Sequence, residues 1–76
     1  MTVDDLIAQA RDNRIGPLNS GGLSPSDLSD FLRLALGFLL EDLDYEADKT
    51  SGGAVAARVL AALITGADET AAKALQ

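Results

Sequence analysis

The stretch SPSDLSDFLRLALGFLLEDLD, residues Ser24–Asp44, decides the fold of this 76-residue chain. Ser24 is a good N-cap, Pro25 suits the first helical position and Asp27 completes a capping box, so a long helix is predicted to begin here. At about 100° per residue, its apolar side chains span an arc of roughly 240°, far wider than the arc of about 100° usual for a surface helix. The arc consists of Leu28, Phe31, Leu32, Leu34, Ala35, Leu36, Phe38, Leu39, Leu40 and Leu43.

Only a narrow strip of this helix is predicted to face water, and it comprises Asp30, Arg33, Gly37, Glu41 and Asp44. We expect the helix to be covered on most other sides, by two further helices of the chain and by a second subunit. Phe38 lies near the middle of the arc, which predicts that its ring is buried.

A first helix is predicted from Val3 to Ile15, because Thr2 and Asp5 have the spacing of a capping box and a Gly-Pro pair follows. A third is predicted from Gly53 to Thr65, with Gly66 as its stop. Asp68 then caps a short final helix, Glu69–Leu75. The sequence therefore predicts an all-α fold, a small bundle of three main helices plus a short C-terminal helix, in one helical domain spanning residues 1–76.

The composition excludes several kinds of chemistry. Twelve acidic and six basic residues give a net charge of −6, which argues against direct binding of nucleic-acid phosphates. Histidine and cysteine are both absent, so zinc fingers, disulfides and cysteine or Ser-His nucleophiles are ruled out. Neither Gly21-Gly22 nor Gly52-Gly53 has the Lys-Ser/Thr that completes a phosphate-binding loop. We expect no enzymatic activity, no cofactor and no metal.

An acidic run, Glu41–Asp48, ends the central helix. Asp42, Asp44, Glu46 and Asp48 fall at alternate positions of an EF-hand-like loop, but Ala47, Lys49 and Gly53 occupy positions that need other residues. Carboxylates in the last turn also oppose the helix dipole. The helix is therefore predicted either to end near Leu43 or to project toward solvent or a partner, and the run is either a solvated surface or a contact for a basic partner.

Two sets of residues are candidate partner contacts. Glu41, Asp44 and Asp48 belong to the acidic run, where they are predicted to meet a basic surface. Ala57 and Ala61 belong to a stripe of small residues that begins at Gly53 and lets two helix backbones approach closely, within the chain or between subunits.

The length, acidity and helical layout resemble those of acyl carrier proteins, which carry phosphopantetheine on the serine of an Asp-Ser-Leu motif at the start of the second helix. Here the corresponding stretch is Ser24-Pro25-Ser26-Asp27-Leu28, with serine before aspartate. The resemblance therefore covers the gross layout and not the residue that holds the prosthetic group.

These features predict a non-enzymatic helical assembly or adaptor protein that acts through protein contacts. It would be a homo-oligomer or a small subunit of a larger particle such as a virion, without direct nucleic-acid or membrane binding. The acidic N-terminus lacks the pattern of a secretion signal, so a cytoplasmic or virion location is expected. The alternative is an acidic inhibitor that mimics nucleic acid, for which Asp27, Asp30, Glu41, Asp44 and Asp48 would supply one edge.

Overall fold

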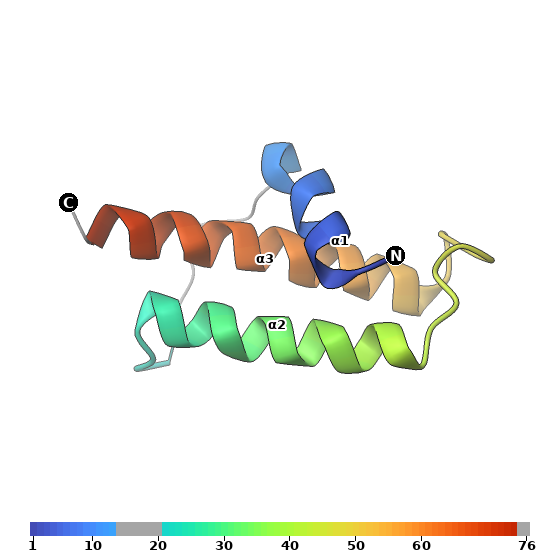
Figure 1. Cartoon of the computed structure of the whole chain (residues 1–76), viewed down its shortest axis with the longest axis horizontal. Coiled ribbons are helices and arrows are strands. Elements are labelled where there is room, and N and C mark those ends of the chain that lie inside the picture. The colour runs from blue at the N-terminus through green and yellow to red at the C-terminus, as the bar shows by residue number, and fades with distance from the viewer. Residues whose placement is uncertain (14–20, 75–76) are drawn as a thin grey trace.

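The computed structural model describes residues 1–13 and 21–74. Its elements are α1 (Val3–Gln9), a short 3-10 turn η1 (Arg11–Asn13), α2 (Pro25–Glu41) and α3 (Gly52–Ala74). No strand occurs among the described residues, which confirms the all-α prediction. Helices α2 and α3 run antiparallel side by side, and α1 packs against both of them (Figure 1). The molecule measures 41 × 22 × 17 Å.

The predicted starts of the first two helices are confirmed. Thr2 Oγ1 accepts a hydrogen bond from the Asp5 amide at 3.2 Å, while Asp5 accepts one from the Thr2 amide at 3.0 Å. Ser24 Oγ accepts from the Asp27 amide at 3.1 Å, with Pro25 opening α2. These bonds satisfy amides that would otherwise lack partners at a helix start.

The ends of the helices differ from the prediction. Helix α1 ends at Gln9, and the 3-10 turn η1 follows after the C-cap residue Ala10. Residues 14 and 15, the last two of the predicted helix, lie outside the described residues. Helix α2 ends at Glu41 with Asp42 as its C-cap, so the first of the two alternatives for the acidic run holds.

The predicted stop at Gly66 and the separate short helix are wrong. Helix α3 continues for 23 residues, with Gly66 buried in its middle. A glycine inside a helix costs only about 1 kcal/mol relative to alanine, so tertiary packing outweighs it. Asp68 does not cap a new helix; its carboxylate contacts Ser29 and Arg33 of α2 instead.

The core lies between the three helices. Its largest fully buried side chains are Leu6, Leu36 and Ile64, one from each helix. Ala57 and Ala61 are also fully buried, within the core cluster of the chain itself. The stripe of small residues is therefore taken up by intramolecular packing, and these two alanines are unavailable to a partner while the fold is intact.

A buried tyrosine anchors the loop between α2 and α3 to the core. The Tyr45 ring belongs to the core cluster, and its hydroxyl accepts a hydrogen bond from Arg58 at 3.2 Å. Arg58 also donates to the Lys49 carbonyl at 2.6 Å. Arg58 therefore fixes this loop against the first turns of α3.

Candidate protein-interaction surface

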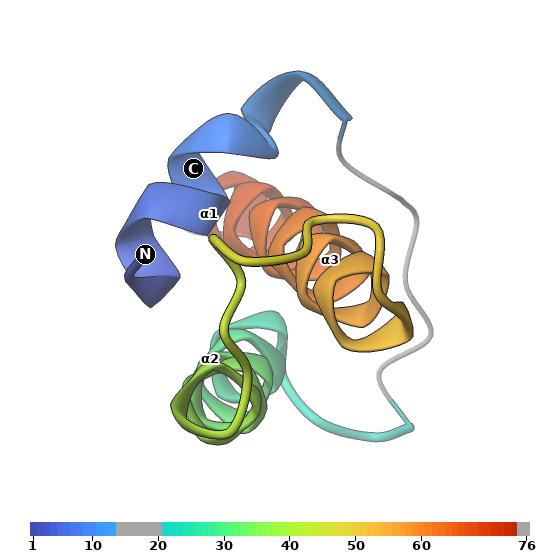
Figure 2. The ribbon, with the colours of Figure 1, turned by 90° about the vertical axis from the view of Figure 1, so that its right-hand side faces the viewer.

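The other helices of the chain cover only part of α2, and the expected cover of the remainder by a second subunit stays a prediction. Phe31, Leu34 and Phe38 are 62%, 61% and 60% exposed. Figure 2 shows the cause, because α1 and α3 both lie to one side of α2 and leave its opposite side uncovered. The prediction that Phe38 belongs to the core of the chain is wrong.

The strip that was predicted to face water instead faces the other helices in part. Arg33 reaches Asp68 of α3, and Gly37 lies beside Val3 of α1, whose Cγ2 would be 4.0 Å from an added Cβ. Because the apolar arc of α2 spans about 240°, several sides of the helix could face the core. In the structure, the side that carries Leu32 and Leu36 is the buried one.

The three exposed side chains form a single row. Residues spaced three and four apart lie on the same face of an α-helix, so Phe31, Leu34 and Phe38 line up along about two turns. We call this row the outer face of α2. A contiguous exposed apolar patch rimmed by polar residues is typical of a binding surface.

Carboxylates flank the outer face at both ends. Asp27 and Asp30 precede it, Glu41 and Asp42 follow it, and all four are exposed. Within residues 1–13 and 21–74, none of the four forms an ion pair. The only basic residue of α2, Arg33, is bonded to α3. The outer face is therefore an apolar row between two pairs of carboxylates that have no ion-pair partner among the described residues.

Of the three acidic residues predicted to contact a partner, only one lies beside the outer face. Glu41 flanks the outer face, whereas Asp44 and Asp48 lie in the following loop and bond to its backbone. Asp44 accepts from the Ala47 amide at 3.2 Å, and Asp48 accepts from the Thr50 amide at 2.9 Å. The bonds from the Thr50 hydroxyl and amide lower the pKa of Asp48 below its ordinary value. These two carboxylates shape the loop.

In the part of the chain that the structure describes, no group of three or more acidic side chains is arranged to hold a metal ion. Three carboxylates of the acidic run have separate partners: Asp44 and Asp48 make the two loop bonds, and Glu46 lies 3.7 Å from the Lys49 ammonium.

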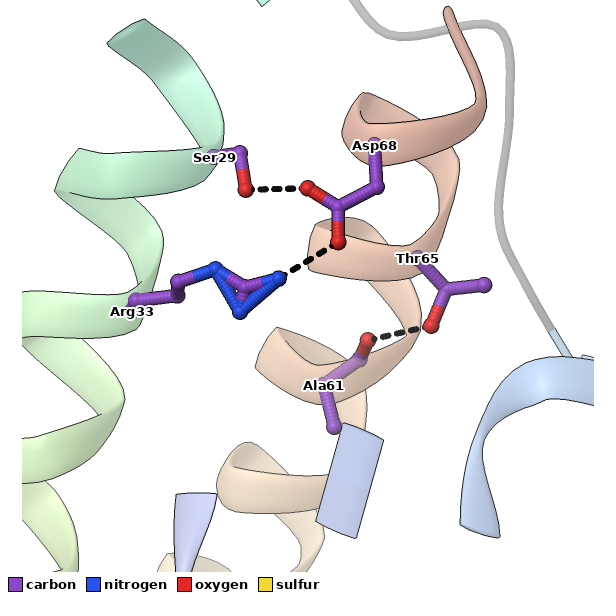
Figure 3. A network of polar contacts seen from close by, with 5 residues as sticks. All are labelled: Ser29, Arg33, Ala61, Thr65 and Asp68. Carbon is purple, nitrogen blue, oxygen red and sulfur yellow. Dashed lines mark hydrogen bonds and ion pairs between the residues drawn. The ribbon is translucent and has the colours of Figure 1, made fainter. Parts of the chain in front are cut away.

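A second polar feature joins α2 to α3. The Ser29 hydroxyl donates to one oxygen of Asp68, and Arg33 donates to the other at 2.6 Å (Figure 3). Beside it is a hollow of about 370 Å³, lined by Asp4, Ile7, Ala8, Arg11, Arg33, Thr65 and Asp68. Arg33 and Asp68 neutralise each other and join α2 to α3, whereas the Thr65 hydroxyl donates to the Ala61 carbonyl within α3.

Replacing Asp68 with alanine is expected to lower the free energy of unfolding by about 1 to 2 kcal/mol, because the buried Ser29 hydroxyl loses its acceptor. The Arg33–Asp68 pair adds little, since solvent screens both partly exposed side chains. Urea unfolding measures the loss. Adding Ser29→Ala to the variant should recover part of it, because the unsatisfied donor is then removed; no recovery would contradict this account of the network.

The fold and this surface define a small all-α protein with an exposed apolar face on α2. No family model, curated protein or solved structure matches the chain. Among the described residues, no helix is both long enough and apolar enough to cross a membrane.

A surplus of apolar surface on this helix was expected, but its residues were not identified, because helical periodicity alone does not tell which part of a wide apolar arc is turned inward. Two features of the sequence point to this face. The apolar arc is too wide for two neighbouring helices to cover, and acidic residues lie at both ends of the row formed by Phe31, Leu34 and Phe38.

Proposed function

We propose that the chain is a non-enzymatic assembly or adaptor protein that binds another protein through the outer face of α2. The observation that carries this proposal is the row of three large apolar side chains, each about 60% exposed, on one side of a regular helix. A small subunit of a larger particle, such as a virion component, would use such a face, and so would an accessory protein.

The energetics favour a covered face. Burial of apolar surface contributes about 25 cal/mol per Å², and aromatic side chains dominate interface energetics. A helix with apolar anchors at i, i+3 and i+7 is a common element of helical recognition. Phe31, Leu34 and Phe38 have this spacing on α2.

The alternative, an acidic inhibitor that mimics nucleic acid, fits the surface less well. Such a mimic needs carboxylates at regular spacing over one face. Here the apolar row separates Asp27 and Asp30 from Glu41, while Asp44 and Asp48 bond to their own loop. An enzymatic function is disfavoured because the sequence has neither histidine nor cysteine, which removes common acid–base and nucleophilic groups.

The test is photo-crosslinking in the cells from which the chain comes. A photoreactive phenylalanine analogue placed at Leu34 is expected to crosslink to a discrete protein, either a second copy or a different chain. The same analogue at Val55, the start of a smaller exposed apolar pair on α3 with Val59, is the matched control.

The crosslink at position 34 should disappear when Phe31 and Phe38 are both changed to glutamine, while the helical circular dichroism remains. Equal labelling at positions 34 and 55, or labelling that survives the two glutamines, would overturn the proposal.

A further inference from the structure

We infer that the partner of the outer face is a basic amphipathic helix, with Lys or Arg residues near both of its ends and an apolar centre. This inference rests on the proposed function and names the chemistry of its partner. It follows from the length of the site along α2, from the lack of a countercharge beside the four carboxylates, and from the repulsion that these carboxylates exert on other occupants.

The first step is the length of the site. The pair Asp27 and Asp30 is separated from the pair Glu41 and Asp42 by about 13 residues of helix. At about 1.5 Å per residue this is about 20 Å along the axis, with the apolar row between them. A partner helix lying along α2 therefore needs two clusters of positive charge about 13 residues apart and apolar side chains in the intervening turns.

The second step is the missing countercharge. Among the described basic residues, Arg33 pairs with Asp68, Lys49 with Glu46 and Lys73 with Glu69, while Arg58 bonds to Tyr45 and the Lys49 carbonyl. The remaining one, Arg11, lies in η1, which packs against α1 and α3 and not against α2. Docking an uncharged or acidic helix would bring the four carboxylates toward a lower dielectric without a partner, which is unfavourable. Basic side chains at the ends of the partner remove that cost.

The third step concerns a second copy of this chain. Two α2 helices packed antiparallel through the outer face would set Asp27 and Asp30 of one copy against Glu41 and Asp42 of the other. Parallel packing would set each pair against itself. A symmetric interface presents the same patch from both subunits, so either arrangement concentrates like charges. An anionic lipid surface meets the same repulsion. Charge complementarity therefore selects a basic partner chain.

The experiment uses a synthetic helical peptide of about 18 residues with three central leucines spaced three and four apart and two arginines near each end. Two control peptides keep the leucines and carry either four glutamines or four glutamates in place of the arginines. Binding to the full chain is followed by amide chemical shifts. We expect saturable binding of the arginine peptide, with shifts centred on residues 27–42, and at least about tenfold weaker binding of both controls.

A pair of matched protein variants separates local from global charge. The first neutralises the carboxylates that flank the outer face: Asp27→Asn, Asp30→Asn, Glu41→Gln and Asp42→Asn. The second neutralises four exposed carboxylates elsewhere: Asp4→Asn, Asp12→Asn, Glu46→Gln and Asp48→Asn. Each variant loses four of the twelve acidic charges, so its net charge rises from −6 to −2. We expect the first to bind the arginine peptide about tenfold more weakly than the second.

Three results would overturn the inference: no binding of the arginine peptide by the parent chain, equal binding of the glutamate peptide, or equal weakening by the two variants. The peptide series uses the unaltered protein, so a folding defect in a variant does not affect it. Sedimentation distinguishes failure of this inference from failure of the proposed function. If the parent chain is a dimer and the double variant with Phe31→Gln and Phe38→Gln is a monomer, the outer face binds a second copy. The proposed function then stands, and the basic helix is excluded.

Discussion

Replacing Leu36 with alanine is expected to lower the free energy of unfolding by about 3 to 5 kcal/mol, the upper part of the range for a buried leucine. Leu36 is fully buried on the side of α2 that belongs to the core cluster. The cost combines lost burial with the cavity left behind. Because small domains are stable by only about 5 to 15 kcal/mol, this single change removes much of the stability of the molecule.

The matched control lies two residues further along the same helix. Phe38→Ala removes a larger side chain, yet it should change the free energy of unfolding by less than about 1 kcal/mol, because the ring is mostly in water. Urea unfolding followed by circular dichroism measures both variants. A larger loss for Phe38→Ala than for Leu36→Ala would mean that α2 is rotated relative to the structure described here.

Replacing Ala57 with leucine is expected to lower the free energy of unfolding by about 2 to 3 kcal/mol through overpacking. Ala57 is fully buried among the small residues of α3, so the added atoms must displace neighbouring side chains or the helix itself. Well-packed cores have few voids that could accept them.

Ala56→Leu is the control, because Ala56 is the preceding residue of α3 and is exposed. Leucine and alanine are both good helix formers, so this variant should unfold within about 0.5 kcal/mol of the parent. If the two leucine variants had equal stability, the small-residue stripe would not form part of the core.

Local signals in the sequence predicted the helix starts. Thr2 and Asp5 make both bonds of the predicted capping box, and Ser24 accepts the predicted bond from the Asp27 amide, because an N-cap depends on residues only three positions apart. The end of α2 near the acidic run was also one of the predicted alternatives, since carboxylates oppose the dipole at a helix C-terminus.

Features that depend on distant residues could not be predicted in this way. Gly66 and Asp68 have the local pattern of a helix stop and a new cap, yet α3 continues through both. The bonds from Asp68 to Ser29 and Arg33 join positions 39 and 35 residues apart, which a local pattern does not reveal. The same limitation applies to the candidate site, because the inward side of α2 depends on where α1 and α3 pack.

The central claim is that the outer face of α2 lies outside the core and is free to receive a basic helix. Its most direct test is the broadening of side-chain NMR signals by a soluble paramagnetic agent, measured with and without the arginine peptide. We expect strong broadening of Phe31, Leu34 and Phe38 in the isolated protein, none for Leu36, and protection of all three exposed side chains once the peptide is bound. Protection of Phe31, Leu34 and Phe38 in the isolated protein, or their continued broadening at saturating peptide, would contradict it.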